Sequence, residues 1–137
     1  MKLAADANVL LSALIGGQAK RVLLHPSIEE ILTTETTLAE VREYAGQLAR
    51  KRGLAVDIVL LAAATLPVTT VSRTTYKHSL SQARQRIGSR DPDDIDLLAL
   101  AMQLKIPVWS NDNDFENTGV DLYTTASLLA FLESKRD

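Results

Sequence analysis

The stretch RDPDDIDLLALAMQLKIPVWS, residues 90–110, joins an acidic start to an apolar helix and a short apolar strand. Aspartates stand at positions 91, 93, 94 and 96, directly ahead of the apolar run. The segment 92–104 is apolar nearly all the way round, which predicts a buried helix. IPVWS, residues 106–110, predicts a buried strand directly after it. A buried helix leading into a buried strand is typical of an α/β domain.

The rest of the chain repeats this alternation. Apolar or β-branched runs predict further strands at KLAAD (2–6), EEILTT (29–34), LPVTTV (66–71) and VDLYT (120–124). Helical patterns fill the intervals at about 8–25 with a break at Gly16-Gly17, from Thr37 to Gly53, and at 54–65, 76–88 and 126–135. Strands that alternate with helices predict a parallel sheet covered on both faces, an α/β/α sandwich.

Length and composition limit the class of protein. The chain has 137 residues, 46% of them hydrophobic, which predicts one globular domain over residues 1–137. It has no cysteine, so disulfides, thiolate metal sites and a cysteine nucleophile are excluded. Its apolar runs are too short to span a bilayer and no signal peptide is evident, so we expect a cytoplasmic protein without membrane contact. The net charge of −2 argues against binding nucleic acid through a bulk positive potential.

The near-neutral average hides an uneven distribution of charge. From position 91 to 121 the chain carries eight acids and one base. The preceding segment, from 72 to 90, has no acid and carries the bases Arg73, Lys77, Arg84, Arg86 and Arg90. Two interpretations stay open: two solvated faces of opposite charge, or an anionic metal pocket beside a cationic rim for a polyanion.

Several acids fall where a parallel sheet gathers functional groups, at the carboxyl ends of its strands and the following helix starts. Asp6 closes the first strand, Glu40 follows the second, and Asp94 begins the buried helix. Asp112, with Asp114 nearby, follows IPVWS. We therefore expect acids that are 34, 54 and 18 residues apart to converge at one edge of the sheet.

Most of these acids also have a structural interpretation. Thr37 and Glu40 fit a capping box, and Asp91 ahead of Pro92 fits a helix N-cap. Asp112 and Asp114 fit an ordinary turn. Asp6 differs, because it ends an apolar strand and neither a cap nor a turn explains it, so its burial calls for a cation.

The possible ligands favour a hard metal ion. A set of oxygen ligands without His or Cys selects Mg²⁺ or Mn²⁺. The two histidines, His25 and His78, lie away from the acidic positions, which argues against zinc.

Taken together, these motifs resemble the PIN domain, a nuclease fold that includes VapC-type toxins. The resemblance rests on DANVLLS (6–12), Glu40 within TTLAEVREY, RDPDDIDLLALA (90–101) and WSNDNDF (109–115), in this order and over essentially the whole chain. No single motif is specific, but the combination is. It implies five parallel strands in the order 3-2-1-4-5, a homodimer and metal-dependent cleavage of RNA.

The resemblance also assigns roles to residues. The four acids of the family fall on Asp6, Glu40, Asp94 and Asp112, as catalytic and metal-binding residues, with Asp114 as a further metal ligand. Asp93 and Asp96 remain alternatives to Asp94. Asn8 and Ser110 fall on supporting positions. An antitoxin protein is a possible partner, and the resemblance does not say whether DNA is also cut.

The chemistry of phosphodiester hydrolysis fits these residues independently. The reaction needs a nucleophile near neutral pH and stabilisation of charge on the phosphate, and carboxylate-held Mg²⁺ supplies both. The bases at positions 73, 77, 84, 86 and 90 are candidates for contacts with the substrate backbone. Aromatic residues, which stack on bases, make up only 4% of the chain, and Tyr76 and Trp109 are the ones predicted near the site.

Two other classes of function stay open. DANVLL resembles the phosphoryl-transfer signature of haloacid dehalogenases, with Asp6 as nucleophile, although Asn8 replaces the second aspartate of that signature. A receiver domain of the response-regulator type fits less well. The second open class is a non-catalytic binding module that keeps the fold and only part of the pocket.

Overall fold

A parallel sheet forms the centre of the protein. The computed structural model describes residues 1–88 and 92–134, and within them the sheet has five strands in the order β3-β2-β1-β4-β5. All four neighbouring pairs are parallel, which confirms the predicted class and strand order. The strands are β1 (Lys2–Ala5), β2 (Glu30–Thr34), β3 (Thr69–Val71), β4 (Val108–Trp109) and β5 (Leu122–Tyr123).

Helices connect the strands and largely follow the predicted positions. They are α1 (Ala7–Leu14), α2 (Gln18–Leu23), α3 (Glu35–Lys51), α4 (Val56–Ala64), α5 (Arg73–Tyr76), η1 (Lys77–Ser79), α6 (Leu80–Ile87), α7 (Pro92–Leu104), η2 (Asn113–Phe115) and α8 (Thr125–Ser134). Among the described residues, every helix is too short or too polar to cross a lipid bilayer.

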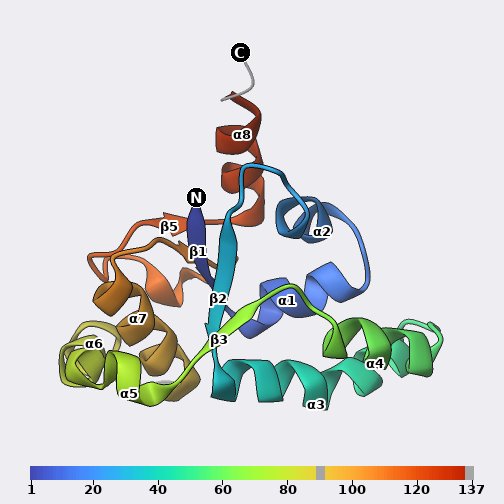
Figure 1. Cartoon of the computed structure of the whole chain (residues 1–137), viewed down its shortest axis with the longest axis horizontal. Helices are drawn as coiled ribbons and strands as arrows, with labels where there is room; N and C mark the ends of the chain where they lie inside the picture. Colours follow the sequence, from blue (N-terminus) through green and yellow to red (C-terminus); the bar gives the residue numbers. More distant parts are fainter. Residues whose placement is uncertain (89–91, 135–137) are drawn as a thin grey trace.

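The sheet separates two apolar clusters. In Figure 1, α5, α6 and α7 cover one side of the sheet and α1 and α2 the other. Alternate strand residues point to opposite faces, so Ala4 and Val108 join the cluster on the α7 side. Leu3, Ala5 and Trp109 join the cluster on the α1 side. This arrangement confirms the sandwich predicted from the alternating pattern.

The predicted helix over 76–88 is broken at its start. A short helix, α5, begins earlier, at Arg73, and the chain then bends at Tyr76, which has φ −114° and ψ 9°. The bend lets the Tyr76 ring enter the core, where its hydroxyl donates to Asp96 Oδ2 at 2.8 Å. The helix is therefore interrupted at Tyr76, where the side chain makes this buried hydrogen bond.

Helix α3 begins at Glu35, two residues earlier than predicted. Thr34, the last residue of β2, is also the N-cap of α3, because its Oγ1 accepts the Thr37 N–H at 3.0 Å. The proposed capping box of Thr37 with Glu40 is therefore wrong. Glu40 lies in the second turn of the helix, where capping does not account for it.

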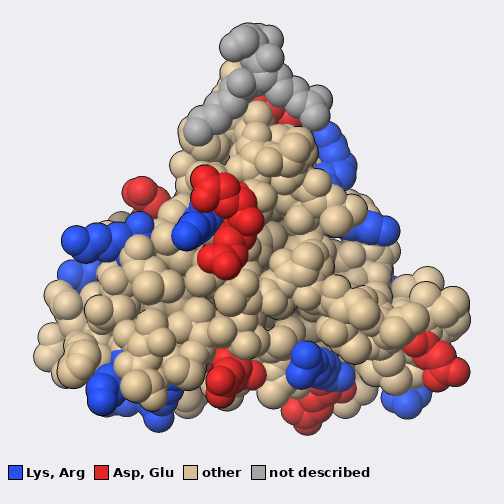
Figure 2. Space-filling model, viewed as in Figure 1, with Lys and Arg blue, Asp and Glu red and all other residues tan. Residues whose placement is uncertain are grey.

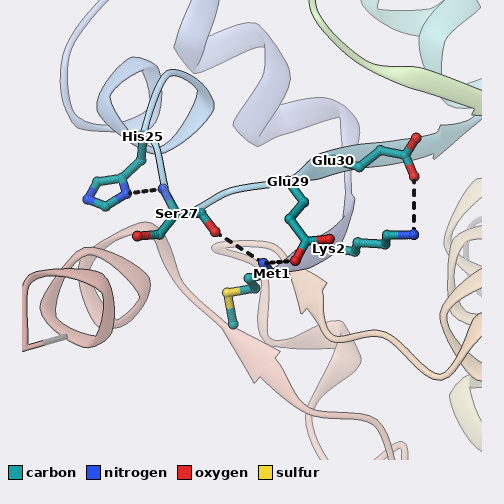
Figure 3. A network of polar contacts seen from close by, with 6 residues as sticks. All are labelled: Met1, Lys2, His25, Ser27, Glu29 and Glu30. Carbon is teal, nitrogen blue, oxygen red and sulfur yellow. Dashed lines mark hydrogen bonds and ion pairs between the residues drawn. The ribbon is translucent and has the colours of Figure 1, made fainter.

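The chain start is tied to the segment before β2. The terminal amine of Met1 donates to the Ser27 carbonyl at 3.1 Å and pairs with Glu29 at 3.3 Å (Figure 3). The Ser27 N–H in turn donates to His25 Nδ1 at 3.1 Å. These contacts lie at the amino ends of the strands, opposite the edge where the acids gather.

Candidate active site

Six carboxylates line one cavity at the carboxyl ends of the central strands. The cavity has a volume of about 200 Å³. Its acids come from the β1–α1 junction, from α3, from the first turn of α7 and from the segment after β4: Asp6, Glu40, Asp93, Asp94, Asp112 and Asp114. Asn8, Thr37 and Leu97 complete the wall with Ala7. The structure thus brings together the five acids predicted as ligands, and adds Asp93.

Asp6 is the most buried of these acids, with 8% of its surface exposed. It is the N-cap of α1, since its Oδ1 accepts the Val9 N–H at 2.9 Å. The sequence interpretation that no cap explains Asp6 is therefore wrong. Its Oδ2 accepts a short hydrogen bond from the Ser110 hydroxyl. Each carboxylate oxygen has a second lone pair, so these two bonds leave Asp6 able to bind a further group.

Burial shifts the titration of Asp6. Loss of solvation raises the pKa of the Asp6 carboxyl above its usual value, because the charged form is disfavoured away from water. The hydrogen bonds from Ser110 and Val9 oppose this shift, whereas the nearby Asp112 carboxylate adds to it. A cation beside these two acids would favour their charged forms.

Ser110 links the first acid to the acids that follow β4. Its Oγ accepts the Asp112 N–H at 3.0 Å while its hydroxyl proton is donated to Asp6. Asp112 caps η2 by accepting the Asp114 N–H at 3.0 Å. Ser110 is completely buried, so it holds the ends of β1 and β4 in a fixed relation.

Helix α7 presents its aspartates in two directions. Asp93, Asp94 and Leu97 line the acidic cavity. Asp96 does not line it; its Oδ2 accepts from the Tyr76 hydroxyl and lies 3.6 Å from Arg73 Nε. Asp96 is therefore placed to anchor α7, which leaves Asp93 as the structural alternative to Asp94. The proposed cap at Asp91 lies outside the described residues.

The oxygen ligands suit a hard divalent cation, although they are not gathered around one point. Within residues 1–88 and 92–134, no three His, Asp or Glu side chains are placed to hold a metal ion together. The cavity nevertheless has six carboxylates and Asn8, and its surroundings disfavour the charge on Asp6. These oxygen ligands suit Mg²⁺ or Mn²⁺. To coordinate one ion together, the longer or exposed side chains would have to rotate toward it.

The predicted backbone-binding cations do not form one group. Arg73 lies 3.6 Å from Asp96, which is outside the cavity, and is 63% exposed. Lys77 and Arg84 are also exposed, on η1 and α6. Arg86 donates to the Thr118 carbonyl at 3.0 Å and lines a separate depression before β4 and β5. Arg90 lies outside the described residues.

The aromatic residues near the site differ from those predicted. Tyr76 and Trp109 are almost completely buried and cannot stack on a substrate base. Tyr44, on α3, is 42% exposed and lines a depression that adjoins the acidic cavity. Sequence reasoning missed it, although it stands one helical turn beyond Glu40.

Solved structures of other proteins share this fold. The chain superposes on the crystal structure of FitAcB from Neisseria gonorrhoeae with a TM-score of 0.63 and 16% identity, covering 92% of this chain and 99% of the other. It superposes on VapBC2 from Rickettsia felis bound to a promoter DNA fragment with a TM-score of 0.64 and 13% identity, covering 90% of this chain and 98% of the other. It superposes on FitAB bound to the IR36 DNA fragment with a TM-score of 0.61 and 17% identity, covering 91% of this chain and 95% of the other.

Sequence comparison identifies the family directly. No curated protein matches the chain. The sequence profile described as PIN domain, however, matches residues 5–133. This span includes every acid of the cavity, and the fold agrees with it. The chain belongs to the PIN domain family.

Proposed function

We propose that this protein is a Mg²⁺- or Mn²⁺-dependent ribonuclease that hydrolyses phosphodiester bonds at the acidic cavity. The observation that carries the proposal is the meeting of six carboxylates from four separate segments in one cavity. Capping accounts for part of Asp6 and Asp112. Glu40 lies in the second turn of α3, beyond the reach of a cap. So many acids in one cavity repel one another, and a cation offsets that repulsion.

The acids have different roles in this proposal, according to their positions. Asp6 and Asp94 are the main metal ligands, and Glu40 and Asp112 bind a second ion or orient the attacking water. Asp114 stands beside them, while Asn8 and Ser110 support the arrangement. A bound metal ion supplies positive charge beside the phosphate and lowers the pKa of water. Water adds to phosphorus, the bond from phosphorus to one sugar oxygen breaks, and a proton passes to that oxygen.

Exposed cations would position the RNA backbone without reading its sequence. Arg73, Lys77 and Arg84 are exposed on α5, η1 and α6, which pack beside α7. On the face drawn in Figure 2, Lys and Arg are interspersed with Asp and Glu. Backbone binding is therefore expected to be local and weakened by salt.

Two protein partners belong to this proposal. Structures of VapBC2 and FitAB, each bound to DNA, have the same fold, which supports an antitoxin partner. A homodimer is the second expectation. Helix α4 exposes the apolar residues Ile58 and Leu61, at 69% and 66%, and such a face is typical of a protein interface.

Cleavage of a labelled single-stranded RNA pool tests the proposal. We expect cutting with Mn²⁺ or Mg²⁺ and none with EDTA. Asp94→Asn and Glu40→Gln should each lower the rate by at least about a hundredfold, because each removes a carboxylate that holds the metal ion or orients the water. Asp121→Asn and Glu116→Gln remove exposed acids outside the cavity and serve as matched controls.

Other results would favour the alternatives. Equal cutting by wild type and the cavity variants would assign the activity to a contaminant. RNA that binds but is not cut with either metal would favour a non-catalytic PIN module. Release of phosphate from a small phosphate ester, lost in Asp6→Asn, would favour phosphoryl transfer.

A further inference from the structure

Two further depressions adjoin the acidic cavity and share lining residues with it. Asn8 and Glu40 also line a depression between α1 and α3, together with Leu11, Tyr44, Gln47, Leu48 and Lys51. Asn8 and Asp112 also line a third depression with Asn111 and Asn113. Because neighbouring depressions share residues, a strand lying across the acids would enter both.

The depression between α1 and α3, the α1–α3 arm, has the composition of a nucleoside site. Tyr44, Gln47 and Lys51 follow Glu40 at intervals of three or four residues, which places them on one face of α3. Leu11 and Leu48 are partly buried and give this arm an apolar floor. Its volume of about 400 Å³ falls in the range of small-molecule sites.

Tyr44 is the aromatic residue best suited to stacking. The structure describes all six aromatic side chains of the protein, and Tyr44 alone is exposed. Tyr76, Trp109 and Phe115 are core residues. Tyr123 and Phe131 pack against each other with ring centroids 5.5 Å apart. An exposed ring beside a depression is free to stack on any base, because every base has a π face.

We propose that the α1–α3 arm is a nucleoside subsite, in which Tyr44 stacks on a base next to the scissile phosphate. The Gln47 amide hydrogen-bonds the base edge and Lys51 contacts a phosphate farther along the strand. This inference rests on the proposed ribonuclease function, since it names how that substrate is held. Amide side chains and aromatic rings are the usual means of recognising unpaired bases.

The spacing along α3 agrees with this assignment. With a rise of about 1.5 Å per residue, Tyr44 stands about 6 Å beyond Glu40 along the helix axis, and Lys51 about 16 Å beyond it. A phosphate held at the acids therefore places its neighbouring base near Tyr44. Lys51, farther along the helix, is then placed to contact a phosphate of the RNA backbone beyond that base.

Binding of a short fluorescent single-stranded RNA, followed by anisotropy in EDTA, tests the subsite without cleavage. We expect Tyr44→Ala to weaken binding about tenfold, in the range of one lost stacking contact. Tyr44→Phe keeps the ring and should bind as wild type does. Leu24→Ala, which removes another exposed apolar side chain outside the α1–α3 arm, should also bind as wild type does.

Two further variants test the polar contacts. Lys51→Ala should reduce the slope of log affinity against log salt concentration by about 1. The control Lys20→Ala, which removes an exposed lysine from α2, should change this slope little. Gln47→Ala should change the base preferred beside the cut while the acids remain intact. The same substitutions in cleavage assays should raise KM more than they lower kcat.

The outcomes separate the subsite from the proposed function. Equal RNA affinity of Tyr44→Ala and wild type, or no binding by wild type, overturns the subsite, even if cleavage needs Asp94. Equal affinity would indicate that the α1–α3 arm binds a protein segment instead of RNA. Weaker binding by Tyr44→Ala without cleavage by wild type keeps the subsite and overturns the nuclease.

Discussion

The hydroxyl of Ser110, at the end of β4, donates to the carboxylate of Asp6, at the end of β1. The same oxygen accepts the Asp112 N–H, so one buried serine connects acids that are far apart in the sequence. Because β1 and β4 are neighbours in the sheet, the bond also fixes the centre of the proposed site.

We expect Ser110→Ala to harm both stability and activity. The Asp6 carboxylate loses a hydrogen bond that lowers its pKa, and the Asp112 N–H loses its acceptor. Loss of a buried bond to a charged group costs about 1–3 kcal/mol of unfolding free energy. The acidic limb of the pH–rate profile should also move to higher pH, because Asp6 then protonates more readily.

Urea unfolding and pH-dependent RNA cleavage measure these effects. Ser81→Ala, on the exposed side of α6, is the matched control and should change neither. An unchanged acidic limb in Ser110→Ala would show that Asp6 ionisation does not limit the reaction.

Divalent metal should stabilise the folded protein. An ion that binds only the folded state at ten times its Kd adds about 1.4 kcal/mol to the unfolding free energy. Thermal unfolding with millimolar Mg²⁺ or Mn²⁺ should therefore show a raised Tm, and Asp94→Asn should reduce the rise. Asp121→Asn should keep it. A Tm independent of metal in the wild type would contradict the proposed metal site.

The sequence predicted the fold well because burial and helix signals agreed. Helix α7 begins at Pro92 as predicted, where proline and aspartates suit a first turn. Its apolar surface on nearly all sides matches seven buried residues in the middle of the sandwich. The order of strands followed from the PIN resemblance, since alternation alone does not specify which strands are neighbours.

The errors arose where one residue serves two elements. Asp6 and Thr34 each follow or end a strand and also cap the next helix, with no loop between. A sequence pattern that assumes a separate loop misses such caps and places α3 too late. The orientation of Asp96 could not be predicted either, because it depends on the buried Tyr76 hydroxyl.

Asp94 and Asp96 should respond to substitution in different ways. Asp94 lines the acidic cavity, so Asp94→Asn should abolish cleavage with little loss of stability. Asp96 anchors α7 to Tyr76, so Asp96→Asn should keep most of the cleavage, because an amide oxygen still accepts from the tyrosine. Tyr76→Phe removes that donor and should lower the unfolding free energy by about 1–3 kcal/mol.

Paired urea unfolding and cleavage measurements decide between the two aspartates. Loss of cleavage in a folded Asp96→Asn variant, with activity kept in Asp94→Asn, would reverse the assignment. Loss in both would indicate that the orientation of α7 itself limits catalysis.

The cap of α3 provides a separate test of the fold. Thr34→Ala removes the acceptor of the Thr37 N–H and should cost about 0.5–2 kcal/mol of unfolding free energy. Thr36→Ala, two residues away and exposed, should cost much less. Equal losses in urea unfolding would contradict the assignment of Thr34 as the cap.

Asp6 should make the metal-free protein less stable as pH rises. Burial raises the Asp6 pKa above the value near 3.8 that it has when unfolded, so between these two values the folded state binds more protons. Stability then decreases as pH increases through the folded pKa. Asp6→Asn removes this charge and can still accept the Val9 N–H. In EDTA, urea unfolding should show an advantage of Asp6→Asn over wild type that is larger at pH 7.5 than at pH 4. An advantage of the same size at both pH values would mean that the Asp6 charge is not the cause, and that the site can hold this carboxylate without a cation.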